Sequence, residues 1–77
     1  MKNAEMSQAD MILMFMRENG SITPLDAIRE FGCLRLGARI YDLRKRGYSI
    51  SRKLDKSTNR YGKTVTYARY MIEEEAG

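Results

Sequence analysis

Four charged residues in the middle of the chain share a regular spacing: Arg35, Arg39, Asp42 and Arg46 stand at i, i+4, i+7 and i+11. On a helix these positions form one stripe along the surface, which is expected to face outward. A guanidinium group is a planar fork of donors that can make two parallel hydrogen bonds, for example to the O6 and N7 edge of guanine. Arg35 and Arg39, near the helix start, are therefore candidates for reading base edges, with roughly 1–3 kcal/mol of discrimination per contact.

The same stripe has a second interpretation. Asp42 can pair with Arg39 and Arg46 along the helix surface, in a solvated network that contributes only tenths of a kcal/mol per pair. Both interpretations can hold together, because a carboxylate beside an arginine also sets the rotamer of that arginine. At the far end of the helix Arg44, Lys45 and Arg46 are suited to contacts with phosphates.

Positive charge is concentrated in residues 29–70. This segment holds twelve of the 14 Lys and Arg but three of the 10 Asp and Glu, a net charge of +9, whereas the remaining residues net −5. A polyanion is the expected partner of such a segment. The acidic run at 73–75 is most simply a solvated tail, although it can also shield the basic surface until a nucleic acid displaces it.

Start and stop signals predict two short helices in the first part of the chain. The first begins with a capping-box-like pair, Ser7 and Asp10, and carries a helical apolar pattern over 9–16. A Thr-Pro start at 23–24 and a stop at Gly32 bound the second, because threonine caps a helix and proline suits the first helical position. The apolar residues of the second helix are three apart on one side: Leu25, Ile28 and Phe31.

A third helix is predicted over 35–46, with Gly47 as its left-handed C-terminal cap. On the flank opposite the arginine stripe, Gly37 and Tyr41 are expected to pack closely against a neighbouring element, with the ring half-buried. The buried stripe of this helix is the apolar repeat at i, i+4 and i+7, formed by Leu36, Ile40 and Leu43.

After Gly47 the apolar period changes from that of a helix to that of a strand. Apolar and polar residues largely alternate over 48–54, and Val, Thr and Tyr dominate 64–72, so two strands are expected with a polar loop at 55–63. This hairpin is either a solvated turn whose lysines deter edge aggregation or a wing that contacts a duplex, which we favour. Arg60 near the tip is the candidate for the minor groove. The candidate backbone contacts are Lys53, Lys56, Ser57, Thr58 and Lys63.

Two helices joined by a glycine-containing turn, with the second helix basic, are typical of a helix-turn-helix, and a following hairpin is typical of its winged form. Residues 10–71 resemble the small winged helix-turn-helix proteins common in phages and prophages. The resemblance implies an α+β fold of three helices followed by a two-stranded wing, and a DNA-binding regulator. It is carried most by Gly20-Ser21-Ile22-Thr23, Phe31-Gly32-Cys33, Arg39-Ile40-Tyr41-Asp42-Leu43-Arg44, and Gly47 with Tyr48 and Ile50.

The length and composition fit one domain over 1–77, with a core at about 7–72, a short N-terminal extension and an acidic C-terminal tail. The chain has no His and one Cys, so neither a zinc site nor a nucleophile-base pair can be assembled, and we expect no metal, no cofactor and no enzyme activity. Cys33 is expected to be a small buried apolar residue. With no disulfide, signal peptide or membrane span in the sequence, a cytoplasmic location is expected, nucleoid-associated when the protein is bound to DNA.

The leading hypothesis is a double-stranded DNA-binding protein, sequence-specific or architectural, that places helix 35–46 in the major groove and the wing over 55–63 on the backbone or minor groove. The alternative is a phage-type inhibitor or adaptor that binds a host protein through the same fold. Phosphate contacts alone do not separate DNA from RNA. The apolar face of the first helix is widened by Met11, Met14 and Phe15, which suits a homodimer, another protein partner or a thick core equally.

Overall fold

Reciprocal side-chain caps set the starts of the first two helices. The Ser7 hydroxyl accepts a hydrogen bond from the Asp10 N–H at 3.1 Å, and the Asp10 carboxylate accepts one from the Ser7 N–H at 3.2 Å. Thr23 and Asp26 repeat this capping box at 3.2 and 3.0 Å. Each box satisfies two N–H groups that a helix start would leave without partners. In the computed structural model, which describes residues 6–73, the helices that begin there are α1 (Gln8–Asn19) and α2 (Pro24–Phe31).

The third helix, α3 (Leu36–Lys45), lies across α1 and buries the predicted apolar stripe. It ends in a left-handed glycine: Gly47 has φ +105°, its N–H donates to the Arg44 carbonyl, and the Tyr48 N–H donates to the Leu43 carbonyl. The predicted C-terminal cap is confirmed. The largest fully buried side chains are Ile12, Met16, Ile22, Ile40 and Leu43, and Cys33 is buried beside them as expected.

The apolar side of α2 does not enter this core. Leu25 and Ile28 are 57% and 44% exposed, and the residue of α2 that is fully buried is Ala27. Phe31 is partly buried and packs edge-on against Phe15 of α1, with the ring centroids 5.8 Å apart. The spacing of Leu25 and Ile28 therefore marks a surface of the helix rather than its buried side.

The hairpin consists of β1 (Ile50–Thr58) and β2 (Thr64–Ile72), paired antiparallel without a bulge. The predicted loop over 55–63 was too long, because β1 continues to Thr58 and leaves a connection at 59–63. Residues 55–58 are polar, but they stay in the strand because each faces a partner on β2. The tight connection is held by Asn59, whose side-chain oxygen accepts hydrogen bonds from the N–H groups of Tyr61 and Lys63.

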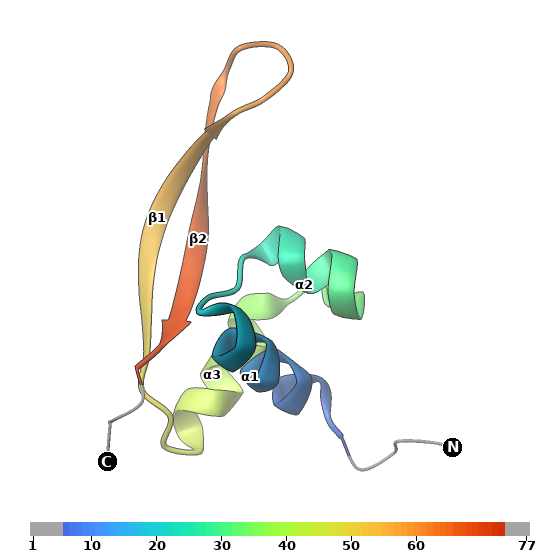
Figure 1. The fold of residues 1–77 in the computed structure, drawn as a ribbon, viewed down its shortest axis with the longest axis vertical. Helices are drawn as coiled ribbons and strands as arrows, with labels where there is room; N and C mark the ends of the chain where they lie inside the picture. Colours follow the sequence, from blue (N-terminus) through green and yellow to red (C-terminus); the bar gives the residue numbers. More distant parts are fainter. Residues whose placement is uncertain (1–5, 74–77) are drawn as a thin grey trace.

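Figure 1 shows the hairpin rising well past the three helices, which gather around its base. A short β-bridge joins the two parts, since Ile22 and Tyr70 exchange two main-chain hydrogen bonds of 2.9 Å just before α2 begins. Three helices followed by an antiparallel hairpin confirm the predicted fold. Within residues 6–73 no helix has the length and apolar character needed to cross a membrane.

Candidate nucleic-acid interface

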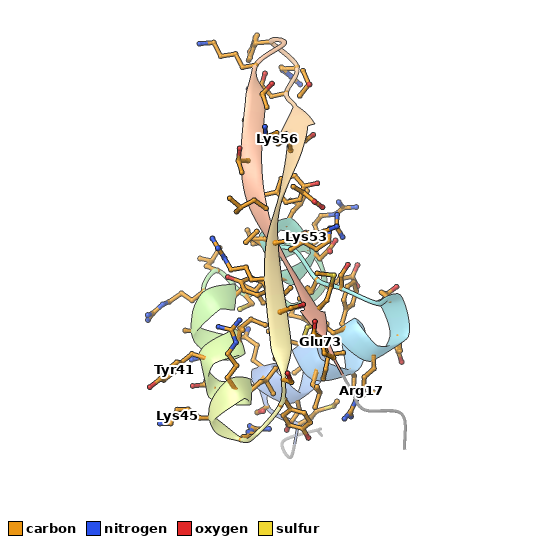
Figure 2. All side chains as sticks on the ribbon, turned by 90° about the vertical axis from the view of Figure 1, so that its left-hand side faces the viewer. Arg17, Tyr41, Lys45, Lys53, Lys56 and Glu73 are labelled. Atoms are coloured by element: carbon orange, nitrogen blue, oxygen red, sulfur yellow. The ribbon has the colours of Figure 1, made fainter. Side chains whose placement is uncertain are left out.

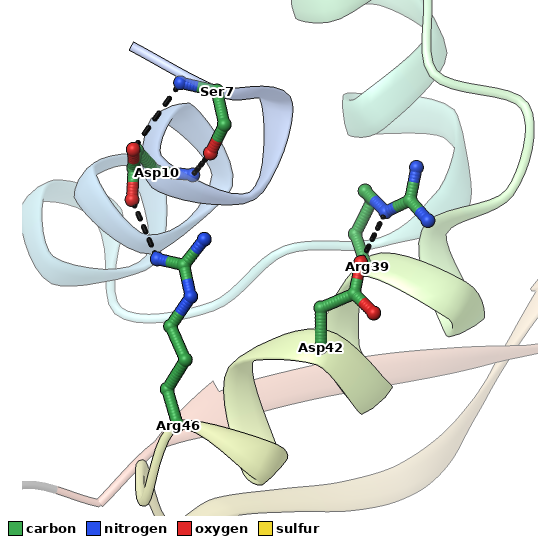
Figure 3. A network of polar contacts seen from close by, with 5 residues as sticks. All are labelled: Ser7, Asp10, Arg39, Asp42 and Arg46. Carbon is green, nitrogen blue, oxygen red and sulfur yellow. Dashed lines mark hydrogen bonds and ion pairs between the residues drawn. The ribbon is translucent and has the colours of Figure 1, made fainter. Parts of the chain in front are cut away.

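One flank of α3 faces the N-terminal end of α1, and it carries the predicted arginine stripe. The Arg39 Nε donates to Asp42 Oδ2 at 2.9 Å, and the Arg46 Nη1 donates to Asp10 Oδ1 of α1 at 2.7 Å (Figure 3). Arg39, Asp42 and Arg46 line a shallow hollow together with Ser7, Gln8 and Ala9. The stripe is thus partly occupied by ion pairs rather than fully turned toward solvent.

Arg39 keeps the donors that base recognition needs. Asp42 engages its Nε, and both side chains stay partly exposed. The two terminal nitrogens point away from Asp42 in Figure 3, and these are the atoms that a guanine edge would accept. Arg39 can therefore pair with Asp42 on the helix surface and still donate to a base edge. Arg35 lies at the N-cap of α3 and is exposed.

Arg46 has a different environment from Arg39. Its hydrogen bond to Asp10 joins the end of α3 to the start of α1, across 36 positions of sequence. The guanidinium lowers the pKa of Asp10 below its ordinary value, with the hydrogen bonds from Ser7 as a further cause, and the carboxylate raises the pKa of Arg46. Arg46, which was predicted as a phosphate contact, thus also connects two helices.

The other flank of α3 faces the hairpin. The Arg44 guanidinium donates to the Ile50 carbonyl at 2.8 and 3.3 Å, and a β-carbon added at Gly37 would lie 3.9 Å from the Tyr70 hydroxyl. The predicted packing of the Tyr41 ring is wrong, because this side chain is 61% exposed. It lies beside Lys45, whose ammonium is 5.5 Å from the ring centroid, and both extend into solvent (Figure 2).

The pairing register sorts the hairpin side chains onto two faces, because directly opposite residues share a face and successive ones alternate. On one face, the α3-side face, Tyr70 reaches toward Gly37 and Ile50 enters the core. The exposed cations of this face are Arg52 and Lys56. The rest of the α3-side face is uncharged: Leu54, Thr58, Thr64, Thr66 and Ala68.

The opposite face, the α2-side face, carries Lys53, Asp55 and Ser57 on β1. Asp55 accepts a hydrogen bond from Arg69 of β2, and the Lys53 ammonium is 3.9 Å from the same carboxylate. This contact with Asp55 raises the pKa of Arg69. The predicted backbone contacts are therefore divided, because Lys53 and Ser57 lie on the face turned away from Lys56.

We define the α3–wing face by the exposed side chains that α3 and the α3-side face of the hairpin present together. On α3 and the hairpin, the described carboxylates are Asp42, bound to Arg39, and Asp55, on the α2-side face. The α3–wing face therefore carries cations, and the one carboxylate of α3 is paired with Arg39. Its members are Tyr41, Arg44, Lys45, Arg52 and Lys56.

The connection at the tip carries two further cations. Arg60 and Lys63 are exposed, as are Thr58 and Tyr61 around them. The turn is held by Asn59 and by Gly62 at φ +80°, so these side chains project from a defined loop. Arg60 thus lies at the far end of the hairpin, as the sequence predicted.

The sequence analysis did not predict two members of the α3–wing face as DNA contacts. Tyr41 was expected to be half-buried, and Arg52 was not among the candidate contacts, although it is a charged residue that breaks the alternation of apolar and polar residues in the first strand. That break in the alternation was the available signal, because the register places Arg52 on the same face as Lys56, four residues along β1. The surface of Met11, Met14 and Phe15 lies elsewhere, on α1, around a hollow of about 220 Å³ rimmed by Glu18 and Glu30.

Comparison with known proteins agrees with this geometry. The family model of the winged helix-turn-helix domain matches residues 7–75, which include all three helices and both strands. Neither a curated protein nor a solved structure matches the chain. Domains of this kind generally bind DNA and are typically non-catalytic. A family model that matches nearly the whole chain, together with the three helices and the hairpin, shows that the chain belongs to the winged helix-turn-helix domain family.

Proposed function

We propose that this protein binds double-stranded DNA through the α3–wing face together with Arg35 and Arg39 on the adjoining flank of α3. The observation that carries the proposal is the sorting of charge on the hairpin. Arg52 and Lys56 lie on the face that continues from α3, whereas Asp55 lies on the other face and is neutralised by Arg69. On this side of the hairpin a duplex meets the two cations, the threonine hydroxyl groups and the uncharged Leu54 and Ala68, but no carboxylate.

In the proposed complex α3 enters the major groove. Arg39 offers its two terminal nitrogens to a guanine while Asp42 holds the Nε, and Arg35 lies one turn earlier. Lys45 and Tyr41 meet the opposite wall of the groove. The hairpin follows the flanking backbone with Lys56, Thr58 and Lys63, and Arg60 reaches the next minor groove.

Binding to duplex DNA at several salt concentrations tests the proposal. Affinity is expected to fall steeply as salt rises, because each phosphate contact releases counterions. Selection from random duplexes is expected to recover a motif, and the paired substitution Arg35→Ala with Arg39→Ala is expected to abolish the preference for it. Competition with duplex RNA at matched salt separates the two nucleic acids.

A matched control removes the same charge elsewhere. Arg29→Ala with Lys53→Ala also deletes two cations, one on α2 and one on the α2-side face. This pair is expected to weaken binding slightly and to keep the preferred motif. Salt-independent binding, or a motif retained without Arg35 and Arg39, would contradict insertion of α3.

The biological role is the finer part of the proposal. By its resemblance to small phage and prophage proteins, we infer a transcription regulator or an architectural factor that acts in the cytoplasm, on the nucleoid. Recovery of a defined motif in the selection favours the regulator. An architectural factor depends on contacts with the DNA backbone and on how easily the duplex deforms, so it is expected to show a weaker motif.

One observation favours a second function, that of an adaptor for a host protein. Met14 is 45% exposed on α1, and it borders the hollow rimmed by Glu18 and Glu30, two carboxylates on a chain whose net charge is +4. Pull-down before and after nuclease treatment separates the functions. Partners that persist without nucleic acid and are lost in Met14→Lys support the adaptor.

A further inference from the structure

The outer edge of β2 presents main-chain groups without partners. Tyr70 exchanges hydrogen bonds with Ile22, so its N–H and C=O point away from β1. In an antiparallel ladder this direction repeats every second residue. The N–H and C=O groups of Thr64, Thr66 and Ala68 therefore also point outward, and within residues 6–73 no main-chain group pairs with them.

The two edges of the hairpin are protected differently. On β1 the outward carbonyl of Ile50 is bound by Arg44, and Arg52 and Lys56 follow along the same edge. Charges on an edge oppose pairing with another strand. The segment 64–68 of β2 has the sequence TVTYA, with no charge, no proline and high strand propensity. This edge lacks the usual protection.

An open groove lies directly beside the unprotected edge. It has a volume of about 570 Å³, with α2 on one side and the α2-side face of the hairpin on the other. Its apolar walls include Leu25 and Ile28, the two α2 residues that the core does not bury, with Val65 and Tyr67 of β2. A strand added to β2 would place every second side chain in this groove.

We propose that the occupant is a second copy of this chain, whose β2 pairs antiparallel with the first to make a four-stranded sheet. A two-fold axis at Thr66 sets Thr66 opposite the partner's Thr66 and Thr64 opposite the partner's Ala68, so that the outward groups of both strands are satisfied. Val65 then faces the partner's Tyr67, a β-branched and aromatic pair that stabilises antiparallel strands. These side chains fill the groove beside Leu25 and Ile28.

The neutral edge is the reason to choose a second copy. Each copy carries a formal net charge of +4, so two copies repel unless they meet where charge is low, and 64–68 is uncharged. At the ends of this segment Lys63 lies opposite the partner's Arg69, whose charge is offset by Asp55. The apolar hollow on α1 is less suitable, because a two-fold contact there would bring Glu18 and Glu30 near their own copies. The outward main-chain groups and the absence of charge therefore both favour residues 64–68 of β2 as the contact between copies.

The symmetry of this dimer has a consequence for DNA, which rests on the proposed function. A two-fold axis perpendicular to the sheet leaves both α3-side faces on the same side. α3 contacts the hairpin at Tyr70 and at Ile50, which is paired with Ile72. Along β2, Tyr70 is four residues and Ile72 six residues from Thr66. At about 3.3 Å per residue the two α3 helices are ~26–40 Å apart, a range that includes the half-site spacing of about 34–36 Å.

Sedimentation without DNA tests the dimer, so the result does not depend on nucleic-acid binding. The wild-type protein is expected to approach twice its 8.9 kDa mass as concentration rises to the millimolar range. Thr66→Pro removes an outward N–H, and Thr66→Lys places two ammonium groups at the axis. Both are expected to remain monomeric at concentrations where the wild type is at least half dimeric.

Leu54 provides the matched control, because it lies opposite Ala68 and its N–H points outward from β1. Leu54→Pro and Leu54→Lys are expected to dimerise like the wild type. Circular dichroism checks the fold, and if Thr66→Pro is unfolded, Thr66→Lys decides the test. A monomeric wild type at 1 mM, or a dimer that survives both substitutions at Thr66, overturns the proposal.

Discussion

The Arg44 guanidinium on α3 donates hydrogen bonds of 2.8 and 3.3 Å to the main-chain carbonyl of Ile50, the first residue of β1. These bonds join the last turn of the helix to the base of the hairpin, just beyond the left-handed turn at Gly47. Because Ile50 is buried, its carbonyl depends on this partner. Arg44 therefore helps to set the direction in which the hairpin leaves the helices.

Replacement of Arg44 is expected to act on stability as well as on DNA. Arg44→Ala should lower the free energy of unfolding by about 1–2 kcal/mol, because it removes a charged donor from a main-chain acceptor. Arg44→Lys keeps the charge but not the forked donor, so it should lose part of this stability. Urea unfolding of the three proteins checks the order. An alanine variant as stable as the wild type would mean that Arg44 serves the nucleic acid alone.

The two faces of the hairpin should respond differently to charge removal. Lys56→Ala is expected to reduce the slope of log affinity against log salt by about 0.9, the loss of one phosphate contact. Lys53→Ala removes the same charge three residues away, but from the face that carries Asp55. Its slope should stay close to that of the wild type. Equal slopes for the two variants would contradict the choice of face.

The contact between Asp10 and Arg46 predicts how stability depends on pH. The folded protein holds the pKa of Asp10 below its unfolded value of about 3.9, chiefly through Arg46. A depressed carboxylate pKa stabilises the fold above the unfolded pKa, and this contribution is lost as pH falls through the folded pKa. The difference in melting temperature between wild type and Asp10→Asn should therefore be constant above about pH 5 and shrink below about pH 4.

Glu18 supplies the control for this pH dependence. It lies on the same helix, is exposed and forms no described ion pair. The difference in melting temperature between wild type and Glu18→Gln is expected to change less over the same pH range. A constant difference for Asp10→Asn down to pH 2 would show that the contact with Arg46 does not persist in solution.

The helices were predictable because their signals are local. Ser7 with Asp10 and Thr23 with Asp26 satisfy main-chain groups three residues away, so each pattern specifies a helix start without knowledge of the fold. Gly47 is similar, since a positive φ after an apolar repeat ends a helix in most contexts.

The orientation of α3 was not predictable from such signals. Helical spacing placed Tyr41 and the Arg39 stripe on opposite flanks, but packing against α1 and the hairpin decides which flank meets solvent. The contact of Arg46 with Asp10 spans 36 residues and leaves no mark in the local sequence. The end of β1 was missed for the same reason, because its polar residues are held by partners on β2.

Arg39 and Asp42 provide a test in which affinity and specificity move in opposite directions. If Asp42 orients Arg39, then Asp42→Ala should reduce discrimination at the base that Arg39 contacts by severalfold. The same change removes a negative charge near the duplex, so affinity for unrelated DNA should rise. Arg39→Ala should reduce the preference for the correct base at that position by about 5- to 150-fold, equivalent to 1–3 kcal/mol.

The coupling between these two residues gives the decisive comparison. In the Arg39→Ala background, Asp42→Ala should no longer change base preference, because the side chain it orients is absent. Glu30→Gln, which removes one negative charge from α2, should raise affinity for unrelated DNA slightly and leave preference unchanged in both backgrounds. Additive effects of the two alanine substitutions would mean that the 2.9 Å contact is only a surface ion pair, and that Arg39 binds DNA without its help.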